Sequence, residues 1–298
     1  MVSHRPPEHA VRDLPIREVT LAALRYTSNN LGALTRITMF PFLLSTLLIV
    51  LSIQALTSPG LYLILFLLTY VPHTLFAVAW HRKTLLQTVQ INTPSFPTWH
   101  SRHWLFLFRT FLLLIIFYGI IIFGSIPVGL LSAILPLVTP FLILALFLGA
   151  GYVVARLSFV LPATAVEESY SLDNSWQQTK NQGVRLISAY LLMTMPFILL
   201  YLLISPLIFN GLMSEKPQLP EITEQLMIMD LLQSYINYLQ VNAVGYAFGQ
   251  IILLVLSYFP IAAIITLLSF AFQACTGWIP EEISDDDDAS NEETTKEE

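Results

Sequence analysis

The chain carries little charge for its length. Only 11% of its 298 residues are charged, whereas 55% are hydrophobic. A soluble domain carries about 25% charged residues, so this composition excludes an ordinary soluble enzyme. The net charge of −6 arises at the end of the chain, where residues 281–298 hold ten acids and one lysine. The rest of the chain is basic, and we expect a basic membrane body followed by an acidic, disordered tail over residues 275–298.

Cysteine and catalytic motifs are scarce. Cys275 is the only cysteine in the sequence, which excludes an intrachain disulfide. The sequence lacks a nucleophile elbow, a glycine-rich phosphate loop and a His-Glu-x-x-His motif. Residues 1–36 carry prolines and acids in place of the apolar core of a signal peptide. We therefore expect no enzymatic activity, no cofactor, no bound metal and no nucleic-acid partner.

Long apolar runs are what the chain has in abundance. A helix of about 20 largely apolar residues crosses the hydrocarbon core of a bilayer. Runs of sufficient length occur at residues 37–55, 61–80, 105–124, within 138–161, at 186–209 and within 243–272. The sequence thus predicts an all-α, polytopic membrane helical bundle with six transmembrane helices, in a membrane domain of residues 37–274.

The basic residues predict how this bundle is oriented. Thirteen of the fourteen lysines and arginines lie on one side of the predicted spans, and Lys216 alone lies on the other. Basic residues concentrate in cytoplasmic segments of membrane proteins. We therefore expect both termini to be cytoplasmic.

Two segments on the opposite side are expected to lie at the membrane surface. Residues 125–139 are apolar but contain three prolines, and we interpret them as an interfacial or partly inserted helix. Residues 224–240 carry Asp230, whose burial in a span would cost about 2.5–3.5 kcal/mol. We therefore expect an amphipathic helix on the outer face near residues 224–240.

The N-terminal segment, residues 1–36, contains an amphipathic pattern. Apolar residues recur every three or four positions over residues 16–34, beginning with Ile16 and Val19, while Glu18 and Arg25 fall on another face. This spacing predicts an amphipathic helix on the cytoplasmic surface. A helix that packs against a partner protein would show the same pattern.

A second polar helix is expected near residues 171–183, starting at Ser171. Shifted by 151 positions, the two segments align loosely, so that Asn30 matches Asn181 and Gly32 matches Gly183. Each segment leads into a predicted span, which suggests a weak internal repeat of the kind found in many membrane folds.

Few polar residues stand out as candidates for a structural or functional role. The candidate positions are His73, Arg156, Glu167, Ser175, Trp176 and Asn181. We expect Arg156 to pair with Glu167, in preference to an acid–base role for Glu167 and Glu168, since adjacent residues point different ways on a helix. His73 is the most deeply placed ionisable residue, and it fits either a neutral histidine bonded to a carbonyl or a proton or ligand site.

The basic loop between the second and third spans is rich in aromatic residues. Trp80, Trp99 and Trp104 are typical of the interfacial belt of a membrane protein. His100 and His103 have the spacing of a metal pair on a helix, but the loop between Trp80 and Trp104 holds no Cys, Asp or Glu that would complete a site.

One stretch resembles a known family. An arginine, an apolar run, a proline, a glutamate and then Ser-Trp on a polar helix occur here as Arg156, Pro162, Glu167, Ser175 and Trp176. This pattern resembles the membrane domains fused to some bacterial glycerophosphodiester phosphodiesterases, and related stand-alone six-helix inner-membrane proteins of unknown function. The resemblance covers about 30 residues and implies a bacterial inner-membrane bundle. It does not imply phosphodiesterase activity, because the catalytic domain of those fusions is absent from this sequence.

These observations favour a non-enzymatic inner-membrane protein that organises membrane lipids or partner proteins of the envelope, a second copy of the chain included. The alternatives are a transporter or channel for a small or amphipathic solute, suggested by prolines in the spans, and a membrane enzyme that acts on lipids through residues 156–185. The lack of Asp and Glu at the span centres counts against an ion-coupled carrier.

Overall fold

The computed structural model describes residues 14–86, 98–213 and 228–280, and every regular element among them is helical. The helices are α1 (Ile16–Asn29), α2 (Leu31–Gln54), α3 (Pro59–Leu68), α4 (Tyr70–Leu85), α5 (Ser101–Ile134), the short 3-10 helix η1 (Pro136–Val138), α6 (Thr139–Leu157), α7 (Val160–Ala165), α8 (Leu172–Gln178), α9 (Gly183–Leu212), α10 (Ile228–Val241) and α11 (Ala243–Thr276). Six segments are long and apolar enough to cross a membrane: Leu31–Gln54, Pro59–Leu85, Ser101–Ile134, Pro136–Ala165, Gly183–Leu212 and Ala243–Thr276. The predicted all-α, multi-pass membrane fold is confirmed.

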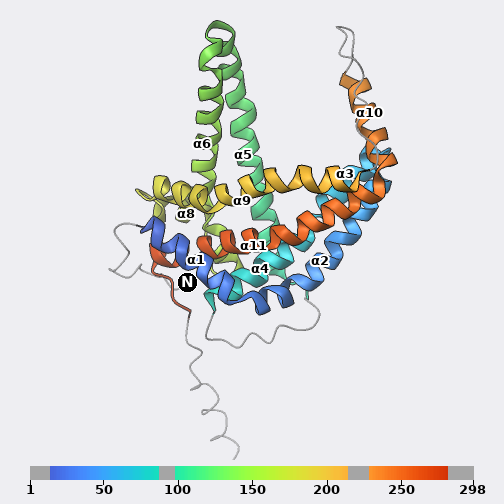
Figure 1. Ribbon diagram of the computed structural model, residues 1–298. Helices are drawn as coiled ribbons and strands as arrows, with labels where there is room; N and C mark the ends of the chain where they lie inside the picture. The colour runs from blue at the N-terminus through green and yellow to red at the C-terminus, as the bar shows by residue number, and fades with distance from the viewer. Residues whose placement is uncertain (1–13, 87–97, 214–227, 281–298) are drawn as a thin grey trace, which may run out of the picture.

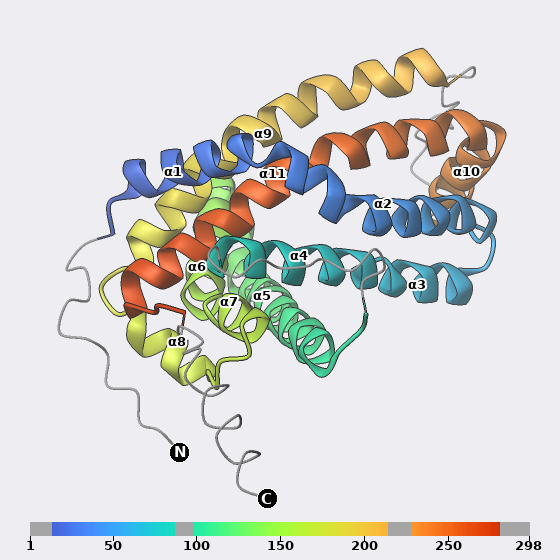
Figure 2. The ribbon, with the colours of Figure 1, turned by 90° about the horizontal axis from the view of Figure 1, so that it is seen from below.

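The helices form two arms that meet at one end (Figure 1). The hairpin arm consists of α5 and α6, which pack along each other and rise away from the other helices. The bundle arm consists of α2, α3, α4, α9 and α11, with α11 packed against α2, α4 and α9. We call the place where the arms meet the junction. It contains α1, α7, α8 and the C-terminal ends of α4, α6 and α11, which gather together in Figure 2.

Aromatic packing and one buried tryptophan hold the bundle arm together. Trp80 of α4 is fully buried, and its ring lies near Phe76 and Tyr26. Its Nε1 atom donates to the carbonyl oxygen of Ala262 at 3.0 Å and to the hydroxyl of Thr266 at 2.9 Å on α11. A buried Trp N–H needs such partners. The prediction that Trp80 belongs to an interfacial belt is therefore wrong, whereas Trp104 is 64% exposed at the start of α5.

The amphipathic pattern of the N-terminal segment covers a protein surface. Helix α1 ends at Asn29, and residues 31–34 already belong to α2. Thr20, Ala23 and Thr27 are buried where α1 packs on α9 and α11. The Glu18 and Arg25 face is exposed, as predicted. The apolar stripe of α1 thus covers the chain's own helices rather than a lipid surface.

The prediction of a separate surface helix over residues 125–139 is wrong. Residues 125–134 continue α5 with Pro127 inside it, and the chain turns only at Leu135 and η1 before α6 begins. A proline removes one backbone hydrogen bond, but in lipid all the other backbone groups still require partners, so the helix continues. With 34 residues, α5 is about 51 Å long, well beyond the roughly 30 Å of a hydrocarbon core.

The second predicted span is divided by a short break. Helix α3 ends at Leu68 and α4 begins at Tyr70, with Thr69 between them and Pro72 in the first turn of α4. The hydroxyl of Thr69 donates to the carbonyl of Phe66 at 2.6 Å. A side chain thus satisfies a carbonyl beside the break, as backbone at membrane depth requires.

Helices α8 and α10 occur near the two predicted surface positions. The Ser171 side chain caps α8 by accepting from the backbone N–H of Asn174 at 3.1 Å, as the sequence predicts. Helix α10 lies at the far end of the bundle arm, away from the junction (Figure 1). Residues 224–227 of the predicted outer helix, the side chain of Asp230 and the acidic tail from residue 281 lie outside the described residues.

The contact between α9 and α11 yields a stability prediction. A Cβ atom at Gly245 would lie 2.2 Å from the backbone oxygen of Leu212, whereas a Cβ at Gly211 meets nothing within 4 Å. Because backbone cannot move aside as a flexible side chain does, we expect Gly245→Ala to destabilise the protein by about 1–3 kcal/mol. Gly211→Ala is the matched control, and it should leave stability unchanged or raise it, since alanine favours a helix. Thermal unfolding in detergent measures both, and equal midpoints would contradict this α9–α11 packing.

Candidate functional site

The junction brings together several of the residues singled out in the sequence. Arg156 is buried at the C-terminal end of α6, and its guanidinium carbon lies 3.5 Å from the centroid of the Trp176 ring. Arg156 Nε donates to the hydroxyl of Thr179 at 3.2 Å, and another guanidinium nitrogen donates to the carbonyl of Trp176. The fully buried Ser175 hydroxyl donates to the carbonyl of Arg156 at 2.7 Å. Arg156, Ser175 and Trp176 thus join α6 to α8.

The expected ion pair between Arg156 and Glu167 is not formed. Glu167 Oε1 lies 3.2 Å from a guanidinium nitrogen of Arg102 on α5, and the Glu167 side chain is 55% exposed. Glu168 accepts a hydrogen bond from Trp278 Nε1 at 2.8 Å. The guanidinium of Arg156 is satisfied by an aromatic face and helix-end oxygens, so it needs no carboxylate. The adjacent acids face different partners, and this does not favour an acid–base pair.

Two further arginines tie α4 and α5 to α7. Arg109 donates to the carbonyl of Val160 at 3.1 Å, to the hydroxyl of Thr164 and to the carbonyl of Tyr170 at 2.6 Å. Arg82 donates to the carbonyl of Ala165, the last residue of α7, at 3.1 Å. The carbonyl groups at a helix C-terminus carry partial negative charge and lack intrahelical partners. These contacts therefore stabilise the junction.

Asn181 and Tyr170 occupy structural positions near this network. Asn181 lies in the turn between α8 and α9 with φ of 70°, a left-handed conformation that asparagine tolerates. Burial raises the pKa of the Tyr170 phenol well above its usual range. Tyr170 therefore stays neutral at physiological pH, which fits a packing role against Phe272.

The two histidines of the basic loop form a helix cap. His103 Nδ1 accepts from the backbone N–H of His100 at 3.0 Å, at the start of α5. The Trp99 ring stacks on His103 with centroids 5.2 Å apart. Over residues 14–86, 98–213 and 228–280, no group of three or more His, Cys, Asp or Glu side chains is placed to hold a metal ion.

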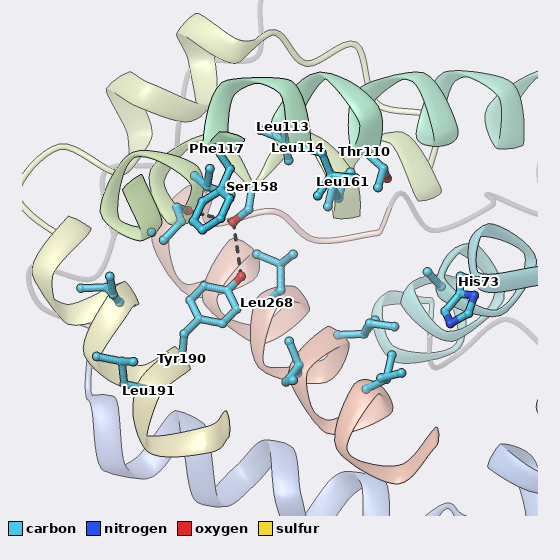
Figure 3. A pocket seen from close by; sticks show the side chains of 18 of the residues that line it. His73, Thr110, Leu113, Leu114, Phe117, Ser158, Leu161, Tyr190, Leu191 and Leu268 are labelled. Carbon is cyan, nitrogen blue, oxygen red and sulfur yellow. Dashed lines mark hydrogen bonds between the residues drawn. The ribbon is translucent and has the colours of Figure 1, made fainter. Parts of the chain in front are cut away.

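A large apolar cavity lies between the hairpin arm and the bundle arm. Its volume is about 730 Å³, within the roughly 300–1,000 Å³ of ligand pockets in proteins. Its walls come from α4, α5, α6, α7, α9 and α11. Figure 3 shows leucine and phenylalanine side chains such as Leu113, Phe117 and Leu268 directed toward it. All the helices that line it belong to the segments that are long and apolar enough to cross a membrane, so the cavity lies among those segments.

His73 lines this cavity from α4, and Figure 3 shows it well apart from Ser158 and Tyr190. Its Nδ1 lies 2.7 Å from the carbonyl oxygen of Thr69 at the α3–α4 break. A carbonyl can only accept, so Nδ1 carries a proton and donates it to the oxygen of Thr69. His73 is therefore bonded to a carbonyl, as one interpretation of the sequence predicted, and it lines the cavity; a proton or ligand site at His73 stays a prediction.

Most of the cavity residues carry no distinctive sequence pattern. Polar atoms of the walls come from α4, α5, the link between α6 and α7, and α9; the residues are His81, Thr110, Ser158 and Tyr190. Their one shared signal is position, since His81, Thr110 and Ser158 follow or precede an arginine by one or two residues. Arg109 lies just inside an apolar run of the sequence, which marks it as unusual. Nothing in the sequence indicates that α7 supplies its hydrogen-bond partners.

Comparisons with protein-family models, with curated proteins and with solved structures give no match to this chain. The resemblance to the membrane domains fused to bacterial phosphodiesterases therefore stays a prediction.

The cation–π contact at the junction can be tested by a conservative substitution. Arg156→Lys keeps the positive charge but loses the planar fork that binds Thr179 and Trp176 together. We expect it to lower the free energy of unfolding by about 1–3 kcal/mol, because buried oxygens lose donors. Arg36→Lys, at an exposed position on α2, is the control and should change little. If denaturation in detergent gives equal stabilities for the two variants, Arg156 does not anchor α6 to α8.

Proposed function

We propose that this protein is a non-enzymatic protein of the bacterial inner membrane that binds membrane lipids and organises them in the envelope. The observation that carries the proposal is the apolar cavity of about 730 Å³ between the two arms. An apolar cavity of this size within a bilayer is surrounded by hydrocarbon chains. A chain that fills the cavity makes dispersion contacts with its walls, which an empty cavity lacks.

The polar chemistry of the junction supports a structural role for the candidate residues. The guanidinium groups of Arg82, Arg109 and Arg156 donate to oxygens of the protein itself. The acids Glu167 and Glu168 contact Arg102 and Trp278. A lipid-acting enzyme would need a nucleophile and a base within hydrogen-bond reach of each other beside the substrate, and the junction side chains do not favour such a pair.

A transporter for an amphipathic solute is the second candidate. It is favoured by the break between α3 and α4, because His73 borders the cavity and bonds Thr69 at that break. Discontinuous helices recur at the binding sites of secondary transporters. Uptake of an amphipathic fluorescent solute into vesicles that contain the protein, compared with vesicles that contain His73→Phe, would separate transport from lipid binding without transport.

Lipid binding in the cavity predicts the effect of a filling substitution. Leu114 of α5 lines the cavity, while its neighbour Ile115 is 67% exposed on the outside of the hairpin arm. Leu114→Trp should displace about two methylene groups of a bound chain, at about 0.8 kcal/mol each, and so weaken binding roughly tenfold. Ile115→Trp should have no effect. Mass spectrometry of lipids that copurify in mild detergent measures this, and unchanged lipid in Leu114→Trp would overturn the proposal.

The proposed orientation places the junction in the cytoplasm, together with both termini. In a Cys275→Ser background, we expect Ser101→Cys, at the start of α5, to resist a membrane-impermeant maleimide in cells whose outer membrane alone is permeabilised. Ser58→Cys, between α2 and α3 at the other end, should react. Ser101 and Ser58 are both exposed, so the comparison is matched. The reverse labelling pattern would invert the topology.

A further inference from the structure

Four polar side chains of the cavity lie at its end nearest the junction. These are His81, Thr110, Ser158 and Tyr190, on α4, α5, the α6–α7 link and α9. The other polar side chains of the cavity, Tyr70, His73 and Thr74, lie seven or more residues before His81 on α4, which corresponds to about 10 Å or more along a helix. What this end of the cavity binds depends on which of its atoms still have a proton to donate.

Two of the three hydroxyl protons at this end, those of Thr110 and Ser158, are used within the protein itself. The Thr110 hydroxyl donates to the carbonyl oxygen of Phe106 at 2.9 Å. The Ser158 hydroxyl donates to the carbonyl oxygen of Ala155 at 2.8 Å. Each hydroxyl has a single proton, so both oxygens retain only lone pairs for a ligand.

The phenol of Tyr190 is committed in the same way. Its oxygen lies 3.3 Å from Ser158 Oγ, and Figure 3 shows the two groups directed toward each other at the cavity wall. Because Ser158 has given its proton to Ala155, Tyr190 is the donor in this pair.

The hydrogen bonds of Ser269 determine which ring nitrogen of His81 carries the proton. His81 Nδ1 lies 2.8 Å from Ser269 Oγ, and Ser269 Oγ lies 2.9 Å from the carbonyl oxygen of Ile265. Both hydrogen bonds form at once only when Ser269 donates to the carbonyl and His81 Nδ1–H donates to Ser269. The neutral ring then carries its lone pair on Nε2. His81 is 1% exposed, and this nitrogen has no hydrogen-bond partner among the described residues.

The charges near this end restrict the ligand further. The guanidinium groups of Arg82, Arg109 and Arg156 are positively charged. They donate to protein oxygens at the junction, so they are not free to bind an anionic ligand. A cationic ligand head would be repelled by these charges and would lose its hydration. An anionic head group requires hydrogen-bond donors, but the polar atoms at this end of the cavity offer only lone pairs. A neutral hydroxyl group of a ligand supplies the proton for a hydrogen bond to one of these acceptors.

We propose that the cavity takes a neutral lipid with a free hydroxyl group, such as a long-chain alcohol or an acylglycerol, which donates to Nε2 of His81. This inference rests on the proposed lipid-binding function and names the lipid class. The hydrocarbon tail lies along the apolar walls formed by residues such as Leu113, Leu148 and Leu268. The hydroxyl supplies a donor to a ring nitrogen at the cavity wall, which is the basis of discrimination against a lipid without a donor.

Competition against one photoreactive probe tests the proposal. The protein is placed in phosphatidylcholine nanodiscs with hexadecanol that carries a diazirine on its chain, and cross-linked residues are mapped by mass spectrometry. The competitors are hexadecanol, its methyl ether, hexadecyl sulfate and hexadecylamine. We expect labelling of cavity residues, and we expect hexadecanol to compete at a mole fraction roughly five- to tenfold lower than the methyl ether, as one hydrogen bond predicts.

Variants locate the acceptor. In His81→Phe the preference for hexadecanol over its methyl ether should disappear, whereas labelling by the chain should persist. Tyr190→Phe removes a neighbouring oxygen and should reduce the preference, and Tyr201→Phe, exposed on the same helix and outside the cavity, is its matched control. The wild-type comparison stands by itself if His81→Phe does not fold.

The outcomes separate this inference from the function on which it rests. If the ether, the sulfate or the amine competes as well as hexadecanol, the hydroxyl specificity is wrong but lipid binding remains. If labelling of the cavity is no stronger than in Leu114→Trp, lipid binding in the cavity is also wrong. A hydroxyl preference that survives in His81→Phe would overturn the assignment of the acceptor.

Discussion

Hydrogen bonds from arginine side chains to the oxygens at helix ends hold together the junction from which both arms extend. Helices α7 and α8 are short, and each leaves carbonyl groups without intrahelical partners. Arg109 and Arg82 supply donors to α7, and Arg156 supplies donors to α8. These donors stabilise the two short helices α7 and α8 beside the ends of the longer helices.

The long helices differ sharply in how much of each is buried. Helix α11 is the centre of the bundle arm, and 44% of the residues in its apolar stretch are buried. The corresponding value is only 6% for α5 of the hairpin arm, and it is also 6% for α9 of the bundle arm. The hairpin arm therefore presents apolar side chains such as Ile122 and Leu130 to its surroundings. In a bilayer these surfaces are solvated by lipid chains, which also have access to the space between the arms.

Polar groups at the junction and in the cavity have opposite chemical characters. At the junction, charged donors meet protein acceptors, and the network is closed. In the cavity, the protons of Thr110, Ser158 and Tyr190 are used within the protein, and lone pairs are left over. A wall of this kind distinguishes ligands by their ability to donate rather than by their charge. The two regions lie side by side because residues adjacent in sequence, such as Arg82 and His81, face different neighbours.

The sequence by itself determined the features that depend on local pattern. Apolar runs predicted the six membrane-capable helices, the three- and four-residue spacing predicted which face of α1 is buried, and Ser171 marked the start of α8. Only the tertiary structure decided the partners of Arg156 and Glu167, the burial of Trp80 and the length of the hairpin arm. The cavity also belongs to this second group, because its walls join residues as distant as His73 and Leu268. The physical reason is that helical periodicity acts over a few residues, whereas partners and cavities arise where separate helices approach one another.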